Sequence, residues 1–253
     1  DHRDLHSFPT RRSSDLSQVM LIIGRQSSGK STFMKVLCYC RWLEKKIMTS
    51  FEDIVPTYTH YKRFKRDLIQ FHRVDELYFR DDTIIEYDGD LVAISYSGVD
   101  NNAKIVKRTY KWNERYNSKL SYIPAERNLI SAIRNINDAY KTKDRDVLFN
   151  FIIEWGEAKD HYTKLSPMPL SVTNDFSYFN DNGQDHIMLP TGETITSFYA
   201  SSGIQSVAPV DVMSDYFAKL VGKTTSFSKS DLLNQLMAIL RVDDESKIDV
   251  NAL

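Results

Sequence analysis

The segment that most constrains this chain is Gly24–Thr32, which reads Gly-Arg-Gln-Ser-Ser-Gly-Lys-Ser-Thr. Its pattern is glycine, four free positions, Gly-Lys, and then serine or threonine, which is typical of a phosphate-binding loop. A short apolar run, Val19–Ile23, precedes it and is long enough for one buried parallel strand. Apolar residues then recur at helical spacing as far as Ile47, which predicts a helix over about 31–47. Strand, loop and helix in this order predict an α/β fold built around an anion site.

Each fixed residue of the loop has an expected role. Gly24 and Gly29 allow the backbone to turn tightly, so that successive N–H groups point at phosphate oxygens. Lys30 is expected to reach the β- and γ-phosphates, and the Ser31 hydroxyl to bind Mg²⁺. The cofactors predicted from this pattern are ATP and Mg²⁺. The residues expected to bind the nucleotide are Gly24, Gln26, Ser27, Ser28, Gly29, Lys30, Ser31 and Thr32.

The first sixteen residues, DHRDLHSFPTRRSSDL, match the translation of a common sequencing adapter in one reading frame without a mismatch. We leave residues 1–16 out of the fold prediction for that reason. Natural sequence is then expected to begin at about Ser17, immediately before the predicted phosphate-loop strand. We expect the chain to be an internal piece of a longer protein.

Composition narrows the class of protein. The chain has 253 residues, is 42% hydrophobic and carries a formal net charge of −1, which is ordinary for a soluble globular protein. The near-neutral charge gives no basic footprint, so nucleic-acid binding is left open without being indicated. No apolar run reaches membrane-spanning length, and no membrane contact is predicted. Cys38 and Cys40 are two positions apart on a predicted helix and share no face, which fits a reduced, cytoplasmic setting.

The pattern along residues 17–253 predicts one partial ATPase domain with three parts: a phosphate-loop unit (17–80), an antiparallel β patch (81–123) and a helical lobe (124–240). Further helices are predicted around Tyr61–Phe71, over about 129–140, over 147–155 with Asp144 near its start, and over Ile204–Leu220 and Lys229–Leu240. Strands are predicted at Thr83–Tyr87, Leu91–Tyr96, Lys104–Trp112, Leu120–Ile123, Asp175–Phe179 and His186–Leu189, with Asp88-Gly89 and Asn182-Gly183 as hairpin turns.

A second candidate anion site is the Ser201-Ser202-Gly203 segment, which immediately precedes an apolar helical pattern. Small residues and a glycine at a helix start leave backbone N–H groups accessible to an anion. A plain helix cap explains the same residues. Earlier in the chain, Arg127 follows a strand-like run, and its role is open. Its side chain could reach a phosphate or pair with a carboxylate, or the segment could be a capping turn with a structural ion pair.

The order of these motifs resembles the ABC-type ATPase superfamily, and more closely the bacterial AAA-family ATP-binding proteins of the SMC and OLD-nuclease type. Those proteins have a phosphate loop like Gly24–Thr32, a strand ending in Tyr-Ile-Pro-Ala-Glu-Arg as at Tyr122–Arg127, and a Ser-Ser-Gly signature as at Ser201–Gly203. The resemblance implies an incomplete central sheet, ATP binding and Mg²⁺-dependent hydrolysis in the complete protein. It also implies an ATP-bound homodimer in which Ser201, Ser202 and Gly203 contact the nucleotide of the partner, and a role in DNA repair or phage defence.

The acidic strand that such ATPases use for Mg²⁺ and for water activation is not found before Leu253, so no catalytic residue is assigned and this piece is expected to be inactive as a hydrolase. The nearest match, Phe151–Glu154, lies in a helical pattern and is rejected. Two alternatives stay open. One is a non-hydrolytic nucleotide-sensing module. The other is a different P-loop enzyme, although the Asn-Lys-x-Asp motif of GTPases and the arginine-rich lid of kinases are not found.

Overall fold

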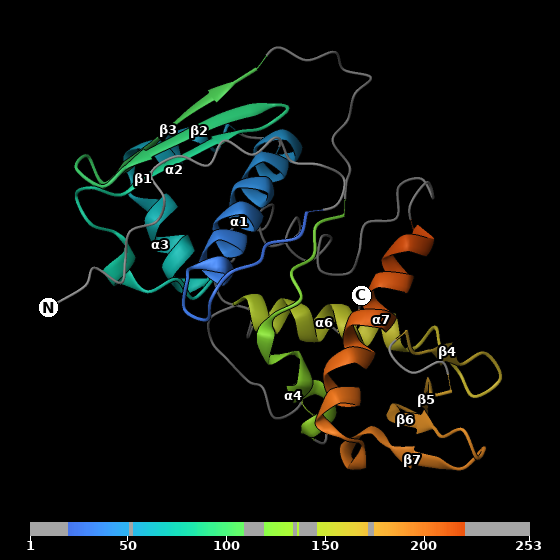
Figure 1. The fold of residues 1–253 in the computed structure, drawn as a ribbon. Coiled ribbons are helices and arrows are strands. Elements are labelled where there is room, and N and C mark those ends of the chain that lie inside the picture. Colours follow the sequence, from blue (N-terminus) through green and yellow to red (C-terminus); the bar gives the residue numbers. More distant parts are fainter. Residues whose placement is uncertain are drawn as a thin grey trace, which may run out of the picture. The chain divides into compact units, whose positions relative to one another are not determined.

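The computed structural model describes residues 20–50, 53–108, 119–133, 136, 146–171 and 175–220. The chain divides into two compact units, residues 1–116 and 117–253, and each is described by itself. The described part is a mixed α/β structure with one three-stranded and one four-stranded sheet, both antiparallel (Figure 1). None of the helices in it is long and apolar enough to cross a membrane.

The first unit is organised around one long helix. Helix α1 (Lys30–Thr49) confirms the helix predicted over 31–47, and its buried side chains recur on one face, at Tyr39, Cys40, Leu43, Glu44 and Ile47. Helix α3 (Arg63–Gln70) confirms the helix predicted from the Tyr61–Phe71 pattern and buries Phe64 and Leu68. Helix α2 (Val55–His60) and the short 3-10 helix η1 (Glu76–Tyr78) are the other helical elements among the described residues of this unit, and they were not predicted.

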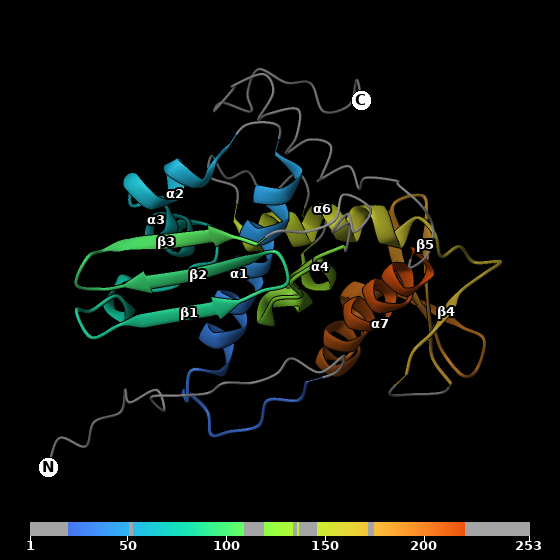
Figure 2. The ribbon, with the colours of Figure 1, turned by 90° about the horizontal axis from the view of Figure 1, so that it is seen from above.

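The β patch of this unit is a meander of β1 (Ile84–Asp88), β2 (Val92–Ser97) and β3 (Asn102–Lys107). Burial alternates along β2, where Val92, Ile94 and Tyr96 face the core, as expected of a sheet that is covered on one side. These side chains join those of α1 and α3 in one apolar cluster. Figure 2 looks onto the sheet from above, with α1 crossing beneath the strands. Each fully buried aliphatic or aromatic side chain in such a cluster contributes about 1.5–3 kcal/mol.

A buried carboxylate ties α1 to the β1–β2 turn. Glu44 is 1% exposed, and its Oε1 accepts hydrogen bonds from the backbone N–H groups of Leu91 at 2.7 Å and Val92 at 3.2 Å. Its Oε2 accepts one from the Tyr87 hydroxyl at 2.5 Å. The glycine of this turn is needed for space, because a Cβ atom at Gly89 would lie 2.6 Å from Glu44 Oε1.

Two predicted strands are wrong. Residues 20–23 form no strand, and Leu21 and Ile23 are each 81% exposed. A parallel strand needs neighbouring strands for its backbone hydrogen bonds, and both sheets of the described residues are antiparallel and exclude this segment. Residues 120–123 also form no strand. The strand predicted over Lys104–Trp112 is β3, which begins at Asn102; residues 109–112 lie outside the described residues.

The second unit contains the helical elements η2 (Ala125–Asn128), α4 (Leu129–Ala132), α6 (Val147–Lys159), η3 (Ser197–Tyr199) and α7 (Ser202–Leu220). Helix α6 confirms the helix predicted over 147–155, but Asp146 caps it by accepting the Phe149 N–H at 2.8 Å. Asp144, most of the helix predicted over 129–140 beyond α4, and the helix predicted over Lys229–Leu240 lie outside the described residues. Helix α7 confirms the prediction over Ile204–Leu220 and contains Pro209 in its interior.

The four-stranded sheet of this unit runs β4 (Met168–Pro169), β5 (Ser177–Asp181), β6 (Gln184–Met188) and β7 (Thr194–Thr196). The predicted Asn182-Gly183 turn is confirmed: Asp181 pairs with Gln184, and both turn residues have positive φ, 50° at Asn182 and 82° at Gly183. Positive φ at both central residues is the geometry of a type I′ turn, which asparagine followed by glycine favours. Side chains of α6, α7 and this sheet form a second apolar cluster around Phe151, Trp155 and Tyr178.

The hydrogen bonds of the Glu44 carboxylate, called here the Glu44 anchor, give the first prediction. In Glu44→Ala, two backbone N–H groups and one hydroxyl lose a buried acceptor, so the free energy of unfolding should fall by about 2–4 kcal/mol. Urea unfolding followed by circular dichroism measures this change. Glu86→Ala is the matched control, because Glu86 is exposed on β1 and its loss should change the stability by about 0.5 kcal/mol or less. Equal effects of the two substitutions would contradict the anchor.

Candidate functional site

The phosphate-loop pattern forms a compact exposed loop at the start of α1. Two of its residues have positive φ, Ser27 at 61° and Gly29 at 81°. The Ser28 N–H donates to the Arg25 carbonyl at 3.3 Å, which closes the turn. Gly24 has an ordinary φ, and its lack of a side chain matters for close approach, because a Cβ there would lie 2.9 Å from Ser28 Oγ. The expected tight turning is therefore confirmed at Gly29, whereas Gly24 provides space.

The Lys30 side chain folds back onto this loop. Its Nζ donates to the Gly24 carbonyl at 2.8 Å, to the Arg25 carbonyl at 2.5 Å and to Ser28 Oγ at 3.3 Å. An ammonium group carries three donor hydrogens, so these acceptors match its capacity. The positive charge thus lies over the loop, next to the backbone that would surround an anion.

The start of α1 adds a second attraction for negative charge. Its N-cap is Gly29, which has no side chain to cap the first turn, and that turn contains no acidic residue. The first N–H groups of a helix lack intrahelical partners, and the helix dipole places about half a positive charge there. Ser31 is exposed in this first turn, where its hydroxyl is accessible to a metal ion bound beside an anion.

The Ser201–Gly203 segment lies in the other unit, at the exposed start of α7. Ser201 caps the helix, because its Oγ accepts the Ile204 N–H at 3.4 Å and its carbonyl accepts the Gln205 N–H at 2.9 Å. The side chain of Gln205 donates to the carbonyls of Ser197 and Phe198 at 3.1 and 3.0 Å, which fixes this turn to η3. The cap interpretation is therefore present in the structure, and Ser202 and Gly203 remain exposed beside it.

The Arg127 side chain donates hydrogen bonds to two backbone carbonyls, which were not among the partners predicted for it. Its Nε donates to the Ser206 carbonyl at 2.8 Å and its Nη1 to the Pro124 carbonyl at 3.4 Å. The guanidinium therefore connects the Tyr122–Arg127 motif with the first turns of α7. Two motifs that are far apart in the sequence are thus brought together within the second unit.

The rejected acidic candidate, Glu154, is part of helix α6, as expected from its periodicity. Its side chain is 6% exposed, pairs with Lys119 Nζ at 2.7 Å and accepts the Ser121 hydroxyl at 2.5 Å. Both carboxylate oxygens of Glu154 are therefore occupied by contacts within the protein. No group of three or more His, Cys, Asp or Glu side chains suitable for a metal ion occurs in the described part of the chain.

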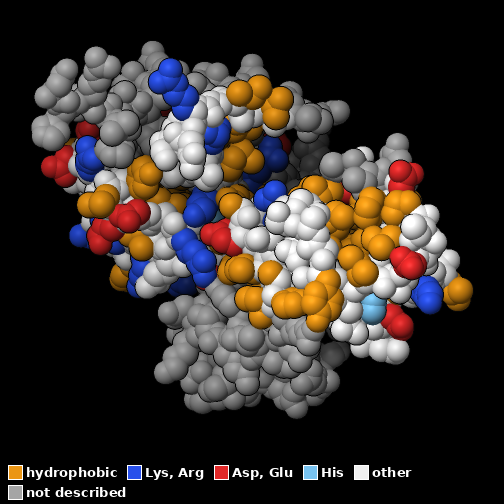
Figure 3. All heavy atoms as spheres, turned by 60° about the horizontal axis from the view of Figure 1, so that its bottom comes forward, with side chains coloured by type: hydrophobic (Ala, Val, Ile, Leu, Met, Phe, Trp, Pro, Cys, Tyr) orange, Lys and Arg blue, Asp and Glu red, His pale blue; other side chains and the backbone are white. Residues whose placement is uncertain are grey.

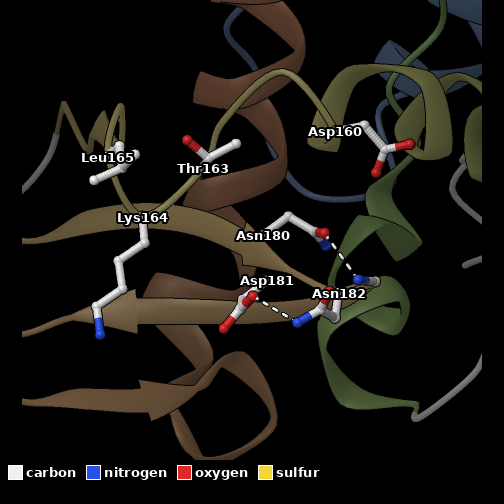
Figure 4. Close-up of a pocket in the computed structure, with 8 residues that line it drawn as sticks. Asp160, Thr163, Lys164, Leu165, Asn180, Asp181 and Asn182 are labelled. Atoms are coloured by element: carbon white, nitrogen blue, oxygen red, sulfur yellow. Dashed lines mark hydrogen bonds between the residues drawn. The ribbon is translucent and has the colours of Figure 1, made fainter.

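A hollow of about 550 Å³ surrounds the Asn182-Gly183 turn of the second unit, and no residue of these motifs lines it. Figure 4 shows Asn180 directed toward the turn, where its Oδ1 accepts the Gly183 N–H at 3.0 Å, and Lys164 directed away from it. The hollow is lined by Asp160, Thr163, Lys164, Leu165, Asn180, Asp181, Asn182 and Gly183. Only the hairpin at its base was predicted from the sequence.

Apolar side chains are also exposed, as Figure 3 shows for one face of the molecule. In the second unit they include Phe198 and Tyr199 in η3, which are 41% and 67% exposed and pack edge to face with ring centroids 5.1 Å apart. This pair immediately precedes the Ser201–Gly203 segment. Neither residue was predicted from the sequence to belong to a site.

No protein-family model matches this chain, and neither a curated protein nor a solved structure matches it. Its function is therefore inferred from the geometry of its own residues.

The contacts of Arg127 give a prediction for the second unit. Arg127→Ala removes both of its bonds to backbone carbonyls, so amide exchange in the first turns of α7 should accelerate and the free energy of unfolding should fall by about 1.5–3 kcal/mol. Hydrogen-exchange mass spectrometry and urea unfolding measure the two effects. Lys164→Ala removes an exposed cation of the same unit and should change neither. Unchanged protection of α7 in Arg127→Ala would mean that these bonds do not hold the helix.

Proposed function

We propose that Gly24–Thr32 binds the phosphates of ATP together with Mg²⁺. The observation that carries this proposal is the position of Lys30 Nζ over an exposed loop whose acceptors are the carbonyls of Gly24 and Arg25. A triphosphate offers stronger, charged acceptors to the same ammonium group. We infer that binding transfers Lys30 from these carbonyls to the β- and γ-phosphates.

The remaining parts of the proposed site follow from the start of α1. Backbone N–H groups at the beginning of α1 face the phosphates, and the helix dipole favours their charge. The Ser31 hydroxyl would bind Mg²⁺, which would supply positive charge beside the phosphates. Gln26, Ser27, Ser28 and Thr32 complete the proposed binding set. We further infer that this loop and helix belong to a P-loop NTPase fold of the ABC type, whose parallel sheet the described residues do not contain.

Hydrolysis is part of the proposal for the complete protein, on the strength of the motif resemblance. Glu154, the acidic candidate considered from the sequence, is not assigned to water activation, because its carboxylate is committed to Lys119 and Ser121. ATP binding without turnover by the complete protein is the result that would favour the sensing alternative.

Lys30→Ala tests the site. Loss of a charge-assisted hydrogen bond costs about 1.5–3 kcal/mol, so the Kd for ATP with Mg²⁺ should rise about 10- to 150-fold. Isothermal titration calorimetry on the full chain measures it. Lys104→Ala removes an equal charge from the exposed strand β3 and should leave the Kd unchanged. Equal ATP affinity of wild type and Lys30→Ala would exclude the assignment of Lys30.

We also propose that ATP drives association of two copies, in which Ser201, Ser202 and Gly203 of one copy contact the γ-phosphate held by the loop of the other. The exposed turn at the start of α7 supplies hydroxyls, backbone N–H groups and a positive helix end. Two-fold symmetry would give two such sites in each dimer. ATP that binds the dimer more tightly than the monomer shifts the equilibrium toward the dimer.

Gly203→Asp is a clean test of this contact. Among the described residues, a Cβ at Gly203 would meet only Ser201 Oγ, at 4.0 Å, so there is room for the new side chain. The added negative charge should abolish ATP-dependent dimerisation, measured by light scattering, and leave the ATP affinity of the monomer nearly unchanged. Ser166→Asp adds the same charge at another exposed position of the unit and should not prevent dimerisation. A constant mass with and without ATP, or a dimer that tolerates Gly203→Asp, would leave Ser201–Gly203 as a helix cap only.

A further inference from the structure

His72 is buried beside helix α1 with both ring nitrogens lacking a hydrogen-bond partner among the described residues. Its side chain is 1% exposed. The ring packs edge to face against Tyr39 of α1 and against Phe71, with centroids 5.5 and 4.9 Å away. A neutral imidazole always carries one N–H, so this packing leaves a polar group in an apolar environment.

Burial and the charge of Lys35 oppose protonation of His72. Lys35 of α1 is the charged side chain that acts on it, and Tyr39 is the titratable group in ring contact from the same helix. On its own segment the neighbour is Arg73, which is also a cation. Burial, and then the charge of Lys35, lower the pKa of His72 from 6.5 to about 3.

The segment that contains His72 is held to α1 by three neighbouring contacts. The Arg73 carbonyl accepts a hydrogen bond from Lys35 Nζ at 3.2 Å. Phe71 stacks on Trp42 of α1 at 6.2 Å, and the His72 ring contacts Tyr39. Arg73 itself has a positive φ of 53°, so the backbone turns sharply there before Val74 enters the core.

We propose that residues 71–74 are a proton-operated latch on helix α1: protonation of His72 expels its ring from the contact with Tyr39 and releases the Arg73 carbonyl from Lys35. The latch acts on the helix that begins with the phosphate loop, at a position five residues beyond Lys30. The device needs no ligand, so it stands or falls independently of the proposed nucleotide site.

The charges around His72 determine whether opening becomes more or less favourable as the pH falls. An imidazolium has two N–H donors and no acceptor, and the carbonyl next to it is already bonded to an ammonium group. The protonated ring is therefore more stable in water than in its buried position. Below the ordinary pKa of histidine the open segment binds the proton and the closed one does not, so opening becomes more favourable as the pH falls from about 6.5 toward 3.

Hydrogen exchange of the peptide that spans residues 68–79 tests the latch. After correction for intrinsic exchange, the opening constant should rise about 30-fold between pH 7.5 and pH 5.0, the ratio given by an open pKa of 6.5 and a closed pKa of about 3. In His72→Phe the same peptide should show no dependence on pH. His60→Gln, which removes an exposed histidine of the same unit, should keep the 30-fold rise.

Three results would overturn the proposal. One is equal pH dependence in wild type and His72→Phe. Another is an equal rise in the peptide that covers β2, because the event would then be unfolding of the whole unit. The third needs no variant and applies even if His72→Phe fails to fold: an NMR titration in which the His72 ring of the wild type titrates near pH 6.5 while the segment stays protected.

Discussion

The first unit depends on the hydrogen bonds of the Glu44 carboxylate, because they join the helix that begins at the phosphate loop to the three-stranded sheet of that unit. The carboxylate lies on the buried face of α1 and binds the β1–β2 turn through two backbone N–H groups and one hydroxyl. A buried carboxylate is costly unless its oxygens are satisfied, so the turn and the helix must take up their positions together. The apolar side chains of Val92, Ile94 and Tyr96 pack in the core between the same helix and sheet.

Local patterns predicted the local elements. The spacing of apolar residues predicted α1, α6 and α7, and Asn182-Gly183 predicted its hairpin, because helix periodicity and turn conformation depend on residues close in sequence. The strand expected at Val19–Ile23 shows the limit of this reasoning. An apolar run indicates that its side chains favour burial, but it does not say which strand will pair with it, and Leu21 and Ile23 are exposed in the structure. The role of Glu44 was equally hidden, because its partners lie 43 to 48 residues away.

In the candidate sites, too, the sequence located the residues of local motifs but not the contacts that they make with distant residues. The loop motif located Lys30 and Ser31 from spacing alone, but only the structure shows that Lys30 bonds to the loop carbonyls. The start of α7 was recognised as either an anion site or a cap, and the cap is visible through Ser201. Arg127 could not be assigned from sequence, since a backbone carbonyl 79 residues away leaves no mark on residue type. Neither could His72, whose unusual property is that both ring nitrogens lack a hydrogen-bond partner among the described residues.

Pro209 gives α7 an uneven stiffness along its length. Proline has no N–H, so the carbonyl of Gln205, four residues earlier, loses its intrahelical donor, and the ring crowds that carbonyl. The first turns of α7 are therefore joined to the rest of the helix by a weakened backbone. In this weakened stretch Arg127 donates a hydrogen bond to the Ser206 carbonyl, and the Gln205 side chain donates to carbonyls of η3. The orientation of Ser201–Gly203 is consequently set from the side, by neighbouring elements, more than by the long helix that follows it.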